Sequence, residues 1–583
     1  MRLPSIPTPK ATMQVAREFR GINRDLLVAD GEWAEEKNLT ADQFPVFYTR
    51  SRRSYGAKIE KPGGVITKDA MAWVDGRNLY YGENLVVENE LSEGEKQMIS
   101  MGAYLLIWPD KVWFNTEWGG GDEDRWGYME QENPTASPIT AYLCRADGGK
   151  YGDITQSAEA PQKPEDGELW MDTSGKTPAL RQWAESSASW ISIATVYVRL
   201  ESTDIGLGLK QWDGVTIEGL KRNLEGLNGS HVLQAAEKDA ITIIGIFSGT
   251  KNTQAESATV RRSVPEMDFV TECDNRIWGC KYGLVNGKVV NEIYASKLGD
   301  FKNWNCFQGL STDSYVASRG SDGVFTGATT HLGHPLFFKE DYIEKVYPAA
   351  NGAHQIVTTE GRGVQKGCHR SLQVVDETLY YKSRKDICAY TGALPVSVSG
   401  ALGDVMYSDA RAGSVGQKYY ISMKDAQGNW HMLCYDTGRN IWHEEDATQA
   451  MMFTTKDGEL WWIDENLGRL VSAAEDAADE KESAFDWFAE SGNIGLGTVE
   501  QKYLARFVIR AELEKETKLR LFLKYDDGRW ICWGEYNKPG LYSFVVPVSA
   551  RRCDHARLRI EGSGGCRIYS ISRLMEKGSD VTC

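Results

Sequence analysis

The sequence predicts an all-β protein: a β-propeller with inserted small β modules and a C-terminal β-sandwich. The first observation is a short aromatic phrase that recurs at Leu79–Tyr81, Leu336–Phe338, Leu379–Tyr381, Tyr419–Tyr420 and Leu460–Trp462. From Leu336 onward it recurs at about forty residues, the length of one four-stranded propeller blade. The second is a composition with 19 Trp, 26 Tyr and 58 Gly, which suits aromatic strands joined by tight turns. The alternative is a set of unrelated buried strands.

Length, charge and cysteine content limit the class of protein. With 583 residues the chain is too long for one ordinary core, so we expect roughly two to four domains. The formal net charge of −16 argues against general nucleic-acid binding by the outer surface, but it is compatible with a locally basic lumen or rim. Eleven cysteines without a regular framework predict reduced thiols. No stretch approaches the roughly twenty apolar residues of a membrane span, and the N-terminus lacks the apolar core of a secretory signal.

The chain begins with an arm and a first group of strands. Residues 1–60 contain few periodic apolar residues, so we expect an extended N-terminal arm that lies across the propeller or a neighbouring subunit. Residues 61–118 are predicted to form the first propeller strands, because their apolar runs are separated by hairpin turns such as Asp75–Gly76.

Blade-like sequence then stops for about 150 residues, which is far more than a blade loop needs. We predict an inserted small β module over residues 119–195 and a second inserted β module over residues 196–265. The first module contains Trp170, Trp183 and Trp190 and is too small to bury three indoles. These three are candidate carbohydrate-binding residues, because a sugar face stacks on an exposed indole. Packing in a small core is an equally good explanation of them.

The C-terminal half resumes the blades and ends in a different pattern. Residues 266–470 are predicted to form the remaining propeller blades, and the acidic, Ala-rich residues 471–486 a linker or short exposed helix. Apolar and polar residues alternate over Leu504–Arg510 and Leu519–Tyr525. This period of two predicts a separate β-sandwich over residues 487–583.

No set of residues carries a recognisable catalytic pattern. The sequence has no nucleophile elbow, phosphate-binding loop, dinucleotide fingerprint or helical metal-binding His pair, so we predict no catalytic residue, no cofactor and no metal. Carboxylate pairs are plentiful, but the separation that glycosidase chemistry requires cannot be read from sequence. A sialidase-like enzyme would also need a set of arginines to clamp a carboxylate. No pattern selects three from the arginines of the propeller region, Arg276, Arg319, Arg362, Arg370, Arg384 and Arg411. We therefore predict that the protein is not an enzyme.

Two short arginine clusters stand out against the acidic background. They are Arg50 with Arg52 and Arg53, and Arg551 with Arg552, Arg557 and Arg559. Either cluster could contact phosphate. Pairing with carboxylates or exposure to solvent is the more common role of such clusters.

Several segments resemble bacteriophage tail proteins. The start of the chain resembles that of tail proteins from phages and prophages of gut Firmicutes, at Phe19–Asn23, Asn38–Leu39 and Phe44–Val46. The end of the chain is similar to the same group, at Arg551–Arg557 and Glu561–Gly564. Asn275–Trp278 and Ser296–Trp304 are similar to the β-propeller of the tail nozzle and packaged-DNA stabilisation proteins of short-tailed phages. Gly167–Trp170 resembles small sugar-binding modules of tail fibres.

The resemblance implies a structural component of the virion. It would be a nozzle-like ring, homo-hexameric, at the distal tail, where it surrounds or closes the DNA channel and supports host attachment. Its partners would be copies of itself, tail adaptor and fibre proteins, and genomic DNA that passes through the lumen without sequence-specific binding. It would be synthesised in the host cytoplasm and would have no membrane span. The alternatives are a peripheral tail adhesin that binds host surface glycan and a glycan-cleaving propeller enzyme.

Overall fold

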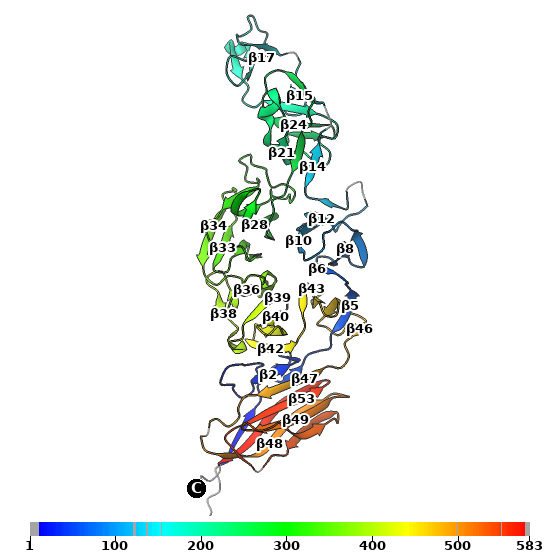
Figure 1. Cartoon of the computed structure of the whole chain (residues 1–583), viewed down its shortest axis with the longest axis vertical. Coiled ribbons are helices and arrows are strands. Elements are labelled where there is room, and N and C mark those ends of the chain that lie inside the picture. Colours follow the sequence, from blue (N-terminus) through cyan, green and yellow to red (C-terminus); the bar gives the residue numbers. More distant parts are fainter. Residues whose placement is uncertain are drawn as a thin grey trace, which may run out of the picture. The chain divides into compact units, whose positions relative to one another are not determined.

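The computed structural model describes residues 11–120, 124–135, 138–152, 154–497, 499–549 and 551–577. Strands are their main secondary structure, and the predicted fold class of propeller, inserted β modules and sandwich is confirmed (Figure 1). The helical elements described are the 3-10 turns η1 (Glu185–Ser187), η2 (Arg222–Leu227), η3 (His369–Ser371) and η4 (Gly400–Leu402). No described helix has the length and apolar character that crossing a membrane requires. The ten cysteines in the described ranges are free, and Cys583 lies outside those ranges.

The chain divides into two compact units. The first comprises residues 1–96, 338–343 and 359–583, and the second comprises residues 97–337 and 344–358.

The first unit contains four blades, each a small antiparallel sheet (Figure 1). Three of them are β6 (Pro62–Thr67) to β9 (Asn84–Val87) with β7 (Met71–Asp75) and β8 (Asn78–Tyr81); β35 (Gln373–Val375), β36 (Thr378–Lys382), β37 (Ile387–Tyr390) and β38 (Val396–Ser397); and β39 (Tyr407–Val415), β40 (Lys418–Asp425), β41 (Trp430–Asp436) and β42 (Ile441–Asp446). The fourth contains β43 (Ala450–Lys456), β44 (Glu459–Asp464), β45 (Arg469–Ser472), β5 (Ser54–Lys58) and β46 (Glu480–Lys481).

The fourth blade combines distant parts of the sequence. Its strand β5 comes from the expected N-terminal arm and lies between β45 and β46, pairing with both. The segment predicted as an acidic linker, residues 471–486, therefore supplies the end of β45 and all of β46 to this sheet. Strand pairing with β5 satisfies backbone groups that a free linker would leave to solvent.

The second unit contains two further blades and most of a third, whose residues 338–343 and 359–360 are assigned to the first unit (Figure 1). Their strands are β10 (Gln97–Met101), β11 (Tyr104–Trp108), β12 (Val112–Asn115) and β13 (Trp126–Tyr128); β27 (Phe269–Cys273), β28 (Arg276–Val285), β29 (Lys288–Ala295) and β30 (Tyr315–Ser318); and β31 (Gly327–His331), β32 (His334–Phe338), β33 (Tyr342–Tyr347) and β34 (Gln355–Glu360). The first two of these blades share a core that includes Trp108, Trp113, Ile277 and Phe301.

The aromatic phrases occupy equivalent strands in most blades. Four of the five lie on the second strand of their sheet, in β32, β36, β40 and β44, whereas Leu79–Tyr81 lies on the third strand, β8. Tyr420 and Trp462 belong to one buried cluster between neighbouring sheets of the first unit. The repeat therefore reflects packing between blades, which each small sheet requires because it cannot bury its faces alone.

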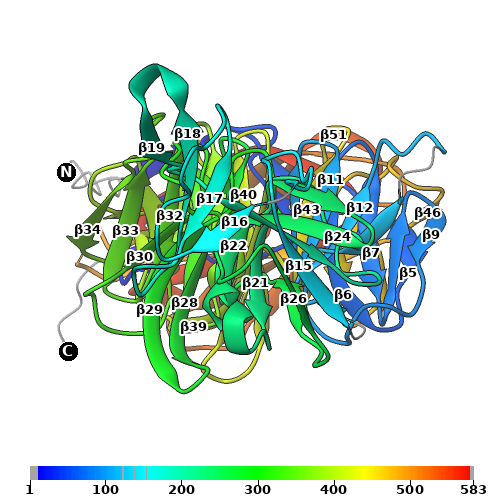
Figure 2. The same ribbon diagram turned by 90° about the horizontal axis from the view of Figure 1, so that it is seen from above.

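The inserted modules between β13 and β27 are nested rather than consecutive. One sheet has the order β14 (Gln131–Pro134), β26 (Thr259–Arg262), β21 (Gly214–Glu218) and β22 (Gly229–Val232), and the other the order β23 (Ala235–Glu237), β24 (Ala240–Ile244), β20 (Tyr197–Glu201), β15 (Ile139–Cys144) and β25 (Lys251–Gln254). The small sheet β16 (Thr155–Ser157), β17 (Leu169–Asp172), β18 (Ala179–Ala184) and β19 (Ser189–Ser192) lies in sequence between β15 and β20 (Figure 2). One core buries Ile139, Ala141 and Leu143 of β15 together with Val198 of β20 and Val260 of β26. This shared core explains why β14 and β15 pair with strands that come later in the sequence.

The sandwich packs two sheets around one core. One sheet has the order β3 (Leu39–Thr40), β4 (Phe47–Thr49), β54 (Cys566–Lys577), β48 (Lys502–Leu513) and β51 (Gly540–Val546), with β1 (Ala11–Ala16) on β54 and β52 (Arg552–Cys553) on β48; the other has the order β2 (Trp33–Lys37), β47 (Asp486–Ser491), β53 (Ala556–Ser563), β49 (Lys518–Tyr525) and β50 (Ile531–Tyr536).

The N-terminal arm is an integral part of this sandwich. Phe19 stacks on Trp33 with ring centroids 6.0 Å apart, and Phe47 packs edge-on against both. Phe47 also contacts Trp487 of β47, at a centroid distance of 5.6 Å. Phe19, Trp33, Leu39 and Phe47 of the arm are buried in the sandwich core, so the arm does not need a core of its own.

The Arg50 cluster pairs with carboxylates. Arg50 Nη1 donates to Glu482 at 2.7 Å, and Arg53 donates to Glu445 at 2.6 Å and to Asp446 at 2.8 Å. Arg53 is buried, so these acids neutralise a charge that has left water. The expectation of carboxylate partners is confirmed for these two arginines.

Candidate functional site

The three tryptophans predicted to bind carbohydrate lie together in the small sheet β16–β19. The Trp190 ring packs edge-on against both Trp170 and Trp183, at centroid distances of 5.3 and 5.5 Å. Trp170 is only 6% exposed, and its indole N–H donates to Ser157. Trp183 and Trp190 are half-buried. Both carbohydrate binding and a small aromatic core use such a cluster, so binding at these residues stays a prediction.

Two of the six propeller-region arginines, Arg370 and Arg411, form ion pairs with the same carboxylate, that of Glu95. A guanidinium nitrogen of Arg370 lies 3.5 Å from Glu95, and one of Arg411 lies 3.6 Å from it. Arg370 comes from the turn η3, Arg411 from β39, and Glu95 from the linker that follows β9. The Glu95 carboxylate is 45% exposed, whereas the Arg370 side chain is 9% exposed. We call Glu95, Arg370, Arg411 and their neighbours His369 and Glu465 the Glu95 cluster.

Arg370 is fixed by the backbone as well as by Glu95. Its guanidinium donates to the carbonyl oxygens of Met451, at 3.1 Å, and Lys96, at 3.2 Å. The Nε atoms of Arg370 and Arg411 are both buried without a hydrogen-bond partner. Burial lowers the pKa of Arg370, and the nearby positive charge of Arg411 lowers it further, while the charges of Glu95 and Glu465 oppose this effect.

His369 is the neutral member of the Glu95 cluster. Burial lowers its pKa to about 4, and the positive charge of Arg370 acts in the same direction. At neutral pH the imidazole is therefore uncharged and can act as a hydrogen-bonding group.

Sequence reasoning could not have assembled this cluster. Arg370 and Arg411 were two of six equivalent candidates, and Glu95 belongs to a run of acidic residues from Glu88 to Glu95 that is typical of a solvated loop. The contacts depend on three segments that meet only in the folded propeller.

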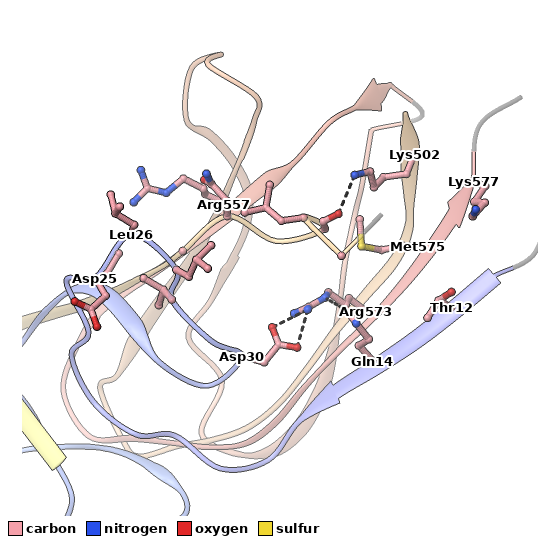
Figure 3. Close-up of a pocket in the computed structure, with 18 of the residues that line it drawn as sticks. Thr12, Gln14, Asp25, Leu26, Asp30, Lys502, Arg557, Arg573, Met575 and Lys577 are labelled. Atoms are coloured by element: carbon pink, nitrogen blue, oxygen red, sulfur yellow. Dashed lines mark hydrogen bonds and ion pairs between the residues drawn. The ribbon is translucent and has the colours of Figure 1, made fainter. Parts of the chain in front are cut away.

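A separate pocket of about 660 Å³ lies in the sandwich, where the arm meets the last strand (Figure 3). Its cationic side chains have partners: Arg573 donates to both carboxylate oxygens of Asp30, and Lys502 donates to the carbonyl oxygen of Gly495 at 2.8 Å. The Arg573 contact links the loop around Asp30 to β54, and the Lys502 contact links β48 to Gly495. The pocket is therefore better explained as the junction between arm and sandwich than as an anion site.

Metal binding has no support in the described side chains. No group of three or more His, Cys, Asp and Glu residues within those ranges is arranged to hold a metal ion.

Comparison with known proteins supplies fold relatives. No protein-family model and no curated protein sequence matches the chain. Among solved structures, an exo-β-1,3-galactanase from Phanerochaete chrysosporium shares 8% identity, with 52% of this chain and 94% of that chain covered and a TM-score of 0.21. A family 43 arabinoxylan arabinofuranohydrolase from Bacillus subtilis shares 9% identity, with 52% of this chain and 94% of that chain covered and a TM-score of 0.16. A Trypanosoma rangeli sialidase shares 9% identity, with 98% of this chain and 96% of that chain covered and a TM-score of 0.20.

These relatives correct two predictions from the sequence. All three are glycan-directed enzymes and none is a tail protein, so they contradict both the tail nozzle and the prediction that the chain is not an enzyme. At these identities and TM-scores the likeness concerns the fold and transfers no residue, substrate or mechanism to this chain.

Proposed function

We propose that the protein is a glycan-cleaving β-propeller and that Glu95 is its reactive carboxylate. The observation that carries the proposal is the environment of this side chain: it is open to solvent, yet it forms ion pairs with two largely buried arginines, at 3.5 and 3.6 Å. An exposed glutamate on a linker ordinarily samples many rotamers. Fixing one with two guanidinium groups costs side-chain entropy and buries positive charge, which is the kind of pre-organisation that a catalytic carboxylate requires.

Glycoside hydrolysis needs a second carboxyl group on the other side of the scissile bond. Glu465 is the candidate for this role, because it is exposed and its charge acts on the Arg370 guanidinium that holds Glu95. In this arrangement one carboxyl protonates the departing glycosidic oxygen, while the other attacks the anomeric carbon or activates water. The neutral imidazole of His369 is suited to bind a sugar hydroxyl beside them.

The proposal is tested by incubating the full-length protein with a panel of plant, fungal and bacterial polysaccharides and measuring the release of reducing ends. We expect release from at least one polysaccharide, and we expect Glu95→Gln and Glu465→Gln each to lower the rate by about 100-fold or more. The matched control is Glu93→Gln, which changes an exposed glutamate on the same linker that pairs with Lys61. The absence of release from every polysaccharide, or full activity of Glu95→Gln, would overturn the proposal.

A further inference from the structure

A groove of about 680 Å³ opens in the second unit, between the inserted sheets and the loop that follows β29. None of the residues that line it was among the candidate site residues predicted from the sequence. One wall contains Trp212 and Ile244 of the insert, and the other contains Phe307 and Leu310 of the loop. Trp212 is 44% exposed and Phe307 is 54% exposed, so both aromatic side chains present surface to solvent. Two exposed aromatic residues in one concave site require an explanation, because single exposed apolar side chains are ordinary but a lined groove is not.

A buried polar network holds the Trp212 wall in place. The main-chain N–H of Trp212 donates to the carbonyl oxygen of Leu233 at 2.8 Å. The next residue, Asp213, is buried, accepts a bond from Arg262 at 2.6 Å and accepts another from Asn303 at 3.0 Å. Trp212 itself has φ +72°, a left-handed conformation that is costly for a bulky side chain. Such a conformation persists only where the surroundings fix it, and it is found frequently at ligand-binding positions.

The same network fixes the distance between the two walls. The Gly214 N–H donates to the Asn303 side chain at 2.8 Å, and Asn303 precedes the Phe307 loop by a few residues. A Cβ atom on Gly214 would lie 2.4 Å from the carbonyl oxygen of Asn305, so the backbones of the two walls touch. Asn305 also donates to Ser230 of β22 at 2.9 Å. The groove is therefore already formed without a ligand, which lowers the entropic cost of binding.

The chemistry of the lining identifies the class of ligand. The polar side chains in the groove are a serine, a histidine and three amides, namely Ser230, His231, Gln234, Asn305 and Gln308. Among the residues that the structure describes, no Asp, Glu, Lys or Arg lines it, and burial lowers the pKa of His231, so this lining is uncharged at neutral pH. Amides and hydroxyls donate and accept hydrogen bonds as sugar hydroxyl groups do, and an indole or phenyl face packs against the C–H face of a pyranose ring.

We infer that this groove binds a neutral saccharide, with Trp212 and Phe307 as its aromatic contacts and Asn305 and Gln308 as its hydrogen-bonding groups. The site lies in the insert and its adjoining loop, and it shares no residue with the Glu95 cluster. The inference therefore goes beyond the proposed function and does not depend on it. An anionic saccharide or a charged peptide fits less well, because the groove offers no opposite charge to offset desolvation of the ligand.

The test is binding of the full-length protein to soluble oligosaccharides, measured by isothermal titration calorimetry. The panel consists of gluco-, galacto- and manno-configured di- to tetrasaccharides together with oligouronides of the same lengths. We expect binding of at least one neutral oligosaccharide and no binding of the oligouronides. Trp212→Ala and Phe307→Ala should each weaken the affinity at least 10-fold. Trp118→Ala, which removes a tryptophan of similar exposure from the segment between β12 and β13 of the same unit, should leave it unchanged.

Folding is checked by the midpoint of thermal unfolding. Phe307 is exposed, so its removal tests the groove even if Trp212→Ala does not fold. The inference is overturned if no neutral oligosaccharide binds at millimolar concentration, if only oligouronides bind, or if Phe307→Ala retains wild-type affinity. Binding that disappears with Trp183→Ala but persists in Phe307→Ala would place the saccharide on the small sheet instead. Loss of hydrolysis in Glu95→Gln with retained saccharide binding would separate this site from the proposed catalytic one.

Discussion

Arg370 joins the carboxylate of Glu95, 3.5 Å away, to the backbone of the same linker and of β43. Its guanidinium donates to the carbonyl oxygens of Lys96, which precedes β10, and Met451 in β43. One side chain thus connects the linker that carries the proposed reactive carboxylate to β43 within the first unit.

Replacing Arg370 by methionine should destabilise the protein. The substitution keeps the apolar stem but leaves two carbonyl oxygens without their donor and Glu95 with one guanidinium, so we expect a loss of about 2 kcal/mol in the free energy of unfolding of the first unit. The measurement is urea denaturation followed by tryptophan fluorescence. Lys61→Met, which breaks an exposed pair with Glu93, should leave the midpoint unchanged. An unchanged midpoint in Arg370→Met would mean that these contacts are dispensable.

The depressed pKa of His369 predicts a specific pH dependence of stability. The folded protein holds this imidazole neutral down to about pH 4, whereas an exposed histidine in the unfolded chain takes up a proton near pH 6.5. Between these values the unfolded state binds more protons, so stability falls as the pH is lowered from 6.5 to 4.

The His369→Gln variant cannot take up this proton. We expect its unfolding free energy to vary less over this pH range than that of the wild type, with a difference between the two on the order of 2 kcal/mol at pH 4. Chemical denaturation at half-unit pH intervals provides the measurement. Parallel pH curves for the two proteins would show that another group causes the acid sensitivity.

The parts of the fold that repeat locally could be predicted from the sequence. Each blade needs an apolar second strand, so phrases such as Leu379–Tyr381 recur and reveal the propeller. Strand pairs formed by distant segments leave no such signal. The pairing of β5 with β45, and the entry of Phe19 and Phe47 into the sandwich core, depend on residues separated by more than half the chain. The nesting of the inserts was missed for the same reason. The partners of β15 are β20 and β25, which follow the small sheet β16–β19 in the sequence.

The candidate sites were even less accessible to sequence reasoning. Trp212 follows an ordinary turn-like stretch, and its exposure depends on a buried network with Arg262 and Asn303 that spans about ninety residues of sequence. The tryptophans that did attract attention are prominent because they are close together in sequence. Trp170 is the most buried of them, which leaves less of its ring available for stacking.

Arg573 should control how firmly the arm is docked on the sandwich. This largely buried side chain contacts both carboxylate oxygens of Asp30 and also donates to Gln14 at 2.9 Å, so it holds two parts of the arm to β54 (Figure 3). Arg573→Ala should cost about 1–2 kcal/mol and increase hydrogen exchange over residues 23–32. Lys577→Ala removes a more exposed pair with Glu500 on the same strand and serves as the control. Equal exchange in both variants would indicate that the arm is held by its aromatic contacts alone.

The spacing between the groove walls can be tested without removing any side chain that lines the groove. Gly214→Ala places a methyl group where only 2.4 Å separates it from the Asn305 carbonyl oxygen, so the Phe307 loop must move away from β21. Because the inferred saccharide contacts both walls, we expect its affinity to fall at least 10-fold while the oligosaccharide preference stays the same. Gly226→Ala, in the same insert, adds its methyl group where no atom lies within 4 Å, and it should bind as the wild type does. Calorimetric titration of both variants with the oligosaccharide that binds the wild type gives the comparison. Equal affinity of Gly214→Ala and Gly226→Ala would show that binding does not depend on the fixed distance between Trp212 and the opposite wall.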